Sequence, residues 1–234
     1  MTAERSTETP GGRMAARIVA IDGPSGSGKS TVARGVAERL SLEVLDTGAM
    51  YRAVTLLVIG TGADPADAAA TTQLAQGMDL EIGACTMLDG RDVSVAIRGP
   101  EVTELVSTVS AHPGVREVLV GRQRAWVAEH GGGVVEGRDI GTVVFPDARV
   151  KVFLTASEAE RARRRHQEER AAHRPIAVDS VHADLARRDS LDSNRRVSPL
   201  KRAPDAFVVD TTKRGVDDVV DEIVERFEVA GRRR

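Results

Sequence analysis

Short apolar runs alternate with longer segments of helical spacing along most of the chain. Five of these runs end near glycine or polar residues, and they cover residues 16–22, 41–48, 132–139, 149–156 and 205–212. Apolar runs of this length are typical of strands that are buried on both faces, and helical segments lie between most of them. The pattern predicts an α/β fold in three layers, with a mostly parallel five-stranded sheet covered by helices on both faces.

Two segments break this alternation. Residues 78–99 hold two short β-like runs on either side of Asp89-Gly90, a dipeptide that favours a tight hairpin, so we expect a small antiparallel insertion there. Residues 160–175 have a helical period but almost no apolar stripe. A helix of that kind is expected to be exposed and mobile.

Composition indicates one globular domain with a balanced surface charge. The chain has 234 residues, of which 41% are hydrophobic, and its net charge is −2. We expect one domain over residues 16–228, a disordered tail at 1–15 and a short tail at 229–234. The balanced charge gives no general attraction for nucleic acid or an anionic membrane, so any anion site must be local.

The number of cysteines and the hydropathy of the chain indicate the cellular compartment in which we expect the protein. Cys85 is the only cysteine, which excludes an intramolecular disulfide and a cysteine-cluster metal site, and we expect it to be a small buried hydrophobe. No apolar run approaches the ~18 residues of a membrane span, and the first residues carry mixed charges without a signal-peptide pattern. We therefore expect a cytoplasmic protein, and a monomer because no exposed apolar stripe calls for a partner.

The stretch DGPSGSGKST after the first predicted strand carries the clearest chemical signal. Gly23, Gly28, Lys29 and Ser30 fit the phosphate-loop pattern G-x-x-x-x-G-K-[ST], and a helical segment follows them. Such a loop turns backbone N–H groups toward phosphates, while the lysine reaches the β- and γ-phosphates and the serine hydroxyl is a ligand for Mg²⁺. Only four of the 33 basic residues are lysines, yet one stands in this loop. We predict a nucleoside triphosphate site.

Two classes of phosphate-loop protein compete, a kinase with a second substrate and a nucleotide-dependent switch. A GTPase switch needs Asn-Lys-x-Asp, but the only asparagine is Asn194, and no Asp-x-x-Gly motif occurs. A kinase for a phosphorylated acceptor needs arginines outside the loop. Arg52 and Arg138 each follow the end of a predicted strand, where open α/β sheets bind ligands, although a solvated surface role is the alternative for any one arginine.

Several motifs together resemble the bacterial cytidylate kinases, which phosphorylate CMP and dCMP with ATP. The motifs are IDGPSGSGKST, LDTGAMYR, EGRDIGTVVFPDA, RARRR and DSNRRVSPL. The resemblance runs from Arg17 to about Glu228. It implies a P-loop kinase fold with a core of residues 16–60 and 110–228, an NMP-binding insertion at about 61–109, and a mobile lid at about 158–175.

The resemblance also implies a division of the site residues. The loop that holds ATP comprises Gly23, Pro24, Ser25, Gly26, Ser27, Gly28, Lys29, Ser30 and Thr31. The acceptor phosphate is expected on Arg52, Arg138 and Arg195, with the Thr47 hydroxyl nearby. Thr47 could equally be the N-cap of the helix that follows it.

The base and ribose of the acceptor have their own implied partners. Ser107, Arg116 and Asp139 match the base pocket, where a carboxylate pairs with the amino group of cytosine and repels the carbonyl of uracil. From the sequence alone, Asp139 could instead pair with Arg138. Arg188 and Asp192 match the ribose contacts, or else form an i, i+4 ion pair on one helix.

The lid and the metal complete the expected reaction, ATP + CMP ⇌ ADP + CDP. Arg164 and Arg165 are expected to reach the transferring phosphoryl group, unless their helix is merely solvated. Glu136 could hold a water of Mg²⁺, or pair with an arginine. No general base is needed, because a phosphate with a second pKa near 6 is already an anionic nucleophile at neutral pH. The nearest alternative keeps the fold and changes the acceptor to another nucleoside monophosphate such as UMP.

Overall fold

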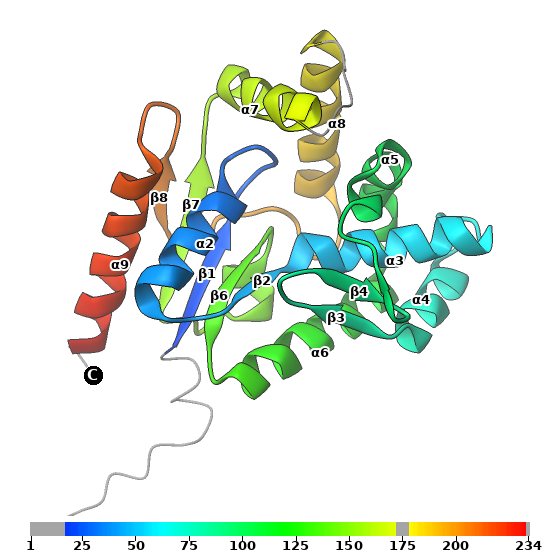
Figure 1. The fold of residues 1–234 in the computed structure, drawn as a ribbon, viewed down its shortest axis with the longest axis horizontal. Helices are drawn as coiled ribbons and strands as arrows, with labels where there is room; N and C mark the ends of the chain where they lie inside the picture. Colours follow the sequence, from blue (N-terminus) through cyan, green and yellow to red (C-terminus); the bar gives the residue numbers. More distant parts are fainter. Residues whose placement is uncertain (1–16, 172–177, 233–234) are drawn as a thin grey trace, which may run out of the picture.

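A central sheet of five parallel strands organises the protein (Figure 1). A computed structural model describes residues 17–171 and 178–232. The strands are β1 (Ile18–Asp22), β2 (Val44–Asp46), β6 (Gly133–Gly137), β7 (Val150–Thr155) and β8 (Phe207–Asp210), and their order is β2-β6-β1-β7-β8. Each lies within one of the five apolar runs, so the predicted α/β fold is confirmed.

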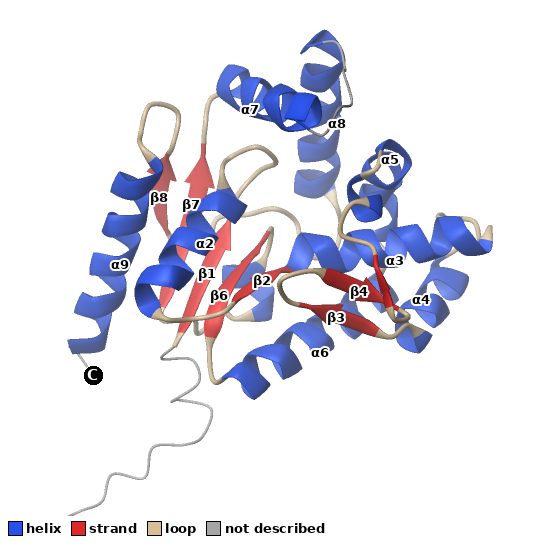
Figure 2. Cartoon of the chain, viewed as in Figure 1, coloured by secondary structure: helices blue, strands red, loops and turns tan. Residues whose placement is uncertain are grey.

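Helices cover both faces of this sheet (Figure 2). Helices α2 (Lys29–Leu40) and α9 (Val216–Arg232) pack on one face, and α3 (Thr47–Thr61) and α6 (Pro113–His130) pack on the other. Alternate residues of β1 enter the two cores: Val19 and Ile21 pack with α2 and α9, whereas Ile18 and Ala20 pack with α3 and α6. Burial on both faces explains why the strand sequence is continuously apolar.

A small antiparallel sheet lies between α3 and α6 in the sequence. It consists of β3 (Leu80–Ile82), β4 (Thr86–Leu88) and β5 (Arg91–Asp92), and it is flanked by α4 (Ala68–Gly77), the 3₁₀ turn η1 (Ala96–Arg98) and α5 (Pro100–Val109). Leu88 pairs with Arg91 across a two-residue turn in which Asp89 and Gly90 have φ values of 48° and 73°. The left-handed conformation of both turn residues is the reason that Asp-Gly signals this hairpin, which is confirmed.

The polar segment forms α7 (Glu158–Ala171), which packs against α8 (Val178–Asn194). Our expectation of an exposed helix is wrong for its inner face, because Arg161, Ala162 and Glu169 are buried and Ala162 packs on Leu185. Two of these three buried residues are charged and form ion pairs, Arg161 with Asp189 and Glu169 with Arg165, so charged side chains occupy positions of a usual apolar stripe. Part of the predicted lid, residues 172–175, lies outside the described residues, as does the predicted tail at 1–15.

Two smaller expectations are also corrected. Cys85 is exposed rather than buried, because it stands in the tight connection between β3 and β4, where the Gly83 N–H donates to the Cys85 carbonyl at 3.1 Å. Helix α9 continues to Arg232 instead of ending at 228, since Phe227 and Ala230 still pack against the core. None of the helices in the described ranges 17–171 and 178–232 is long and apolar enough to cross a membrane.

Candidate active site

The phosphate loop joins β1 to α2 at the carboxyl end of the sheet. Its glycines are required by the geometry, because a Cβ on Gly23 would lie 2.2 Å from the Leu154 carbonyl oxygen and Gly28 has a φ of 90°. Lys29 Nζ donates to the Pro24 carbonyl at 2.8 Å, which folds the side chain back over the loop. Gly28 caps α2 without a side-chain hydrogen bond, so the free N–H groups of the helix open toward the loop. This arrangement suits a bound phosphate chain.

Carboxylates surround the lysine of the loop. Burial, together with the charge of Arg138, lowers the pKa of Lys29, while burial and Asp46 raise the pKa of Glu136. The Ser30 hydroxyl hydrogen-bonds to the Glu136 carboxylate, and Ser30, Asp46 and Glu136 line one cleft. A hydroxyl and two carboxylates are hard oxygen donors, which fit Mg²⁺ when phosphate oxygens complete its coordination.

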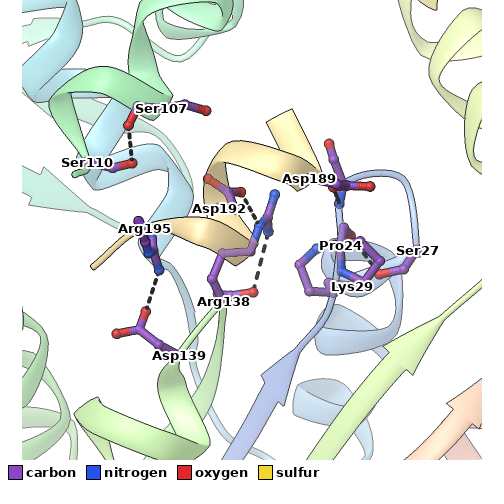
Figure 3. A network of polar contacts seen from close by, with 12 residues as sticks. Pro24, Ser27, Lys29, Ser107, Ser110, Arg138, Asp139, Asp189, Asp192 and Arg195 are labelled. Carbon is purple, nitrogen blue, oxygen red and sulfur yellow. Dashed lines mark hydrogen bonds and ion pairs between the residues drawn. The ribbon is translucent and has the colours of Figure 1, made fainter. Parts of the chain in front are cut away.

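A second pocket lies beside the loop, and its lining is rich in arginine. Figure 3 shows two of these arginines, Arg138 beside Asp192 and Arg195 beside Asp139. The lining of this pocket includes Lys29 and five guanidinium groups from different elements, Arg52, Arg116, Arg138, Arg188 and Arg195. Arg52 donates to the Ile97 carbonyl at 3.0 Å and to the Thr103 hydroxyl at 2.9 Å, which ties α3 to the insertion. Arg138 donates to Asp192 at 2.9 Å. The structure thus brings the predicted acceptor arginines together next to the donor loop.

One buried carboxylate stands among these arginines. Asp139 is 4% exposed, and it forms ion pairs with Arg116 and, at 3.5 Å, with Arg195. Ser107 lines the same pocket, where its carbonyl accepts from the Ser110 hydroxyl at 3.2 Å. Two of the guanidinium N–H groups, Arg116 Nε and Arg188 Nε, are buried without a hydrogen-bond partner among the residues that the structure describes. Buried donors of this kind are suited to the acceptor atoms of a ligand.

Thr47 lies at the junction of the two pockets. Its hydroxyl donates to the Glu136 carbonyl at 2.7 Å, and Asp46, not Thr47, caps α3 by accepting from the Ala49 N–H at 3.0 Å. The N-cap alternative for Thr47 is therefore wrong. The aspartate takes the cap because it precedes the first helical residue in an extended conformation.

The ion pairs differ from the alternatives that local sequence favours. Arg138 pairs with Asp192 rather than with its neighbour Asp139, and Asp192 pairs with Arg138 rather than with Arg188 one helical turn away. Arg138 and Asp139 are consecutive, and their side chains reach partners on different helices. Asp192 turns into the cleft. Burial there raises the pKa of its carboxyl group, but the charges of Arg138 and Arg195 lower the pKa by more, so it is below its usual value.

The two lid arginines take different positions. Arg164 donates to the Thr211 hydroxyl at 2.9 Å, and its Nη1 lies 3.3 Å from where a Cβ on Gly28 would stand, so it touches the donor loop. Arg165 instead pairs with Glu168 and Glu169 on its own helix. Only Arg164 of the two is placed at the phosphate loop in this structure.

Sequence reasoning missed two residues that hold the loop from the α7–α8 side. Arg161 donates to the Ser25 carbonyl at 3.2 Å and pairs with Asp189, and the Ser25 N–H donates to Asp189 at 3.3 Å. The sequence analysis also missed Asp46 as a carboxylate that lines the cleft with Ser30 and Glu136. Its place at the end of a predicted strand, directly before Thr47, could have indicated this role.

Comparisons with known proteins identify the family of the chain. The family model described as cytidylate kinase matches residues 19–229. The chain belongs to the cytidylate kinase family. It is 53% identical to a cytidylate kinase of Corynebacterium glutamicum over 92% of this chain and 96% of that protein, and 50% identical to one of Geobacillus kaustophilus over 88% of this chain and 94% of that protein.

A solved structure shares the family's fold at low sequence identity. It is an uncharacterised protein from Eubacterium ventriosum, which aligns with a TM-score of 0.52 and 12% identity over 92% of this chain and 99% of its own. At this level of identity the likeness shows the fold alone. The family assignment rests on the family model and on the relatives that are 50% and 53% identical to this chain.

Proposed function

We propose that the protein transfers the γ-phosphoryl group of ATP to CMP and dCMP, giving ADP and CDP or dCDP. One observation carries the proposal in this member of the cytidylate kinase family. A single pocket is lined both by Lys29 of the donor loop and by the buried pair of Asp139 and Arg116. A switch protein has no use for a second anion pocket that opens onto its phosphate loop.

The acceptor phosphate is assigned to Arg52, Arg138 and Arg195. Three guanidinium groups neutralise a dianion and hold it by charge-assisted hydrogen bonds. Thr47 and Lys29 line the same pocket as these arginines. The positive charges of Lys29 and the arginines can therefore offset the repulsion between two polyanions.

The base is assigned to Ser107, Arg116 and Asp139, and the ribose to Arg188 and Asp192. A buried anionic carboxylate accepts a hydrogen bond from the 4-amino group of cytosine but faces the 4-carbonyl oxygen of uracil with like polarity. Leaving a buried charged acceptor unpaired costs about 1.5–3 kcal/mol, which favours CMP over UMP by more than tenfold.

Chemistry in this site requires alignment and charge neutralisation rather than a general base. The acceptor phosphate is already an anion, so Lys29, Arg138 and Arg195 orient it for in-line attack and stabilise the charge of the transferring group. Arg164, which donates to the Thr211 hydroxyl beside the loop, is assigned to that group from α7. Mg²⁺ bound near Ser30, with Asp46 and Glu136 around it, would supply charge neutralisation on the triphosphate.

A coupled ADP-release assay with CMP, dCMP, UMP, AMP and GMP tests this function. We expect rapid ADP release with CMP and dCMP, and little with the other acceptors. ADP release that no acceptor stimulates would overturn the kinase assignment. A rate with UMP equal to that with CMP would keep the kinase and overturn the base assignment.

The net charge of the chain and the small size of both substrates lead to an expectation for its location, its oligomeric state and its partners. We expect a cytoplasmic monomer that binds neither nucleic acid nor membranes, because the net charge of −2 is close to zero and both substrates are small. Light scattering coupled to gel filtration checks the monomer, for which a mass of 25.0 kDa is expected.

A further inference from the structure

A buried aspartate at the end of β1 connects the donor loop to the acceptor pocket. Asp22 is 4% exposed and immediately precedes Gly23, the first residue of the phosphate loop. Its two carboxylate oxygens accept from the N–H groups of Ile140 and Gly141, each at 2.8 Å. Both donors belong to the turn that begins directly after Asp139.

That turn has an unusual geometry. Residues Ile140–Val144 form a π-helical turn, and Asp139 precedes it with φ −142° and ψ 25°, outside the regular regions. The Phe145 N–H donates to the Ile140 carbonyl at 2.7 Å, which is the hydrogen bond across five residues that defines a π turn. The first N–H groups of any helical turn have no partner within it, so a side chain or water must satisfy them. Here the Asp22 carboxylate, at the end of β1, satisfies the N–H groups of Ile140 and Gly141.

Gly141 leaves room for the side chains on this side of the turn. A Cβ there would lie 3.2 Å from Lys151 Cδ, which is a tight contact, and 3.4 Å from Asp22 Oδ2, which is an ordinary van der Waals contact. Burial raises the pKa of Asp22 to about 6, even though the two hydrogen bonds lower it. The fold therefore keeps a carboxylate at a site where its charge is costly, at the joint between the two substrate pockets.

We propose that Asp22 is a positioning residue for acceptor recognition, which fixes the turn that aims Arg138 and Asp139 into the acceptor pocket. The inference rests on the proposed function, because Asp139 reads the acceptor base only if the acceptor is CMP. Asp22 itself does not line the acceptor pocket. Its effect travels through two backbone hydrogen bonds, so it should alter the binding and selection of the acceptor more than the binding of ATP.

Asp22→Asn is the variant that tests this. The amide keeps the shape of the carboxylate but offers one acceptor oxygen instead of two, and its NH₂ faces one of the backbone donors. We expect the KM for CMP to rise about tenfold and the CMP-to-UMP selectivity to fall, while the KM for ATP changes less than twofold, since a small misplacement of recognition groups has effects of this size.

Asp67→Ala is the control. Asp67 also holds two backbone N–H groups, at the start of α4, where one carboxylate oxygen, Oδ1, accepts from both Ala69 and Ala70 at 2.9 and 3.0 Å, away from both pockets. Because asparagine would keep that oxygen, alanine is the change that removes this cap, and we expect Asp67→Ala to lower the melting temperature without changing either KM or the selectivity. If the two variants behave alike, Asp22 is only a stabilising cap and the inference is wrong.

A measurement on the unmodified protein covers the case in which Asp22→Asn does not fold. By NMR, CMP binding should slow amide hydrogen exchange at Ile140 and Gly141 but not at Ala69 and Ala70. Equal effects at both pairs would overturn the inference. Failure of the proposed function has a different signature, since the unmodified protein would then release no ADP in response to CMP.

Discussion

Replacing Asp139 by asparagine removes the negative charge that two buried guanidinium groups share. The side chains of Arg116, Arg195 and Asp139 are 3%, 7% and 6% exposed, so water screens their interaction poorly. The amide retains the size of the carboxylate, and the change therefore isolates charge and hydrogen-bond polarity from packing.

The expected magnitude follows from this burial. Removing one partner of a buried ion pair costs about 3–5 kcal/mol, because the other charge stays buried without compensation. For a chain of this size, each kcal/mol corresponds to roughly 2–4 °C in melting temperature, so Asp139→Asn should melt at least about 6 °C below the unmodified protein. Loss of a charged acceptor for the cytosine amino group should lower kcat/KM for CMP by roughly 10- to 150-fold.

Steady-state kinetics with CMP and UMP, together with thermal unfolding, measure both effects. We expect the CMP-to-UMP ratio of kcat/KM to fall, because the amide can donate to the uracil carbonyl, while the KM for ATP stays within about twofold, since Asp139 does not contact the donor loop. Glu222→Gln is the matched control. Like Asp139, Glu222 pairs with two arginines, Arg214 at 2.6 Å and Arg226 at 3.0 Å, but it lies on α9, which packs on the other face of the sheet, so the change should leave the selectivity unchanged.

An unchanged CMP-to-UMP ratio in Asp139→Asn would refute the base assignment, whatever happens to stability. An equal loss on the ATP side would show instead that Asp139 organises the phosphate site.

Three further predictions test side chains around the phosphate loop. Burial lowers the pKa of Lys29 to about 7, and a bound triphosphate should raise it again, so ATP binding at pH 8 should take up protons and ATP affinity should fall as the pH rises above 7. Calorimetry in buffers of different ionisation enthalpy, with EDTA present, measures the uptake, and proton release or an unchanged signal in Lys29→Met would contradict it. Arg164→Ala should lower kcat by roughly a hundredfold and Arg165→Ala by much less, because only Arg164 touches the loop, and equal kcat values in the two variants would reject this distinction. Thr47→Val should lower the free energy of unfolding by about 1–3 kcal/mol in a urea titration, because the Glu136 carbonyl loses its 2.7 Å donor, and an unchanged unfolding midpoint would count against that bond.

The strands, the phosphate loop and the hairpin could be predicted because each depends on local sequence. Residues of β1 are apolar on both faces, Gly28 has a positive φ that its own loop requires, and Asp89-Gly90 selects its own turn. In such elements the information lies within a few residues of the position it determines.

The pairing of charges inside the site could not be predicted in the same way. Arg116 and Asp139 are 23 positions apart, and Arg138 and Asp192 are 54 apart. Several carboxylates and guanidinium groups meet in one cleft, and the tertiary placement of α6 and α8 beside the turn after β6 decides which of them pair. The same reason explains the buried inner face of α7, where Arg161 takes the place of an apolar stripe.

The ratio of kcat/KM for CMP to that for UMP, measured on the unmodified protein with saturating ATP and Mg²⁺, tests the central claim most directly. A pocket that holds Asp139 as a buried anion between Arg116 and Arg195 predicts a ratio well above ten, roughly the effect of one unpaired charged acceptor. A ratio near one would contradict the claim that this carboxylate reads the cytosine amino group.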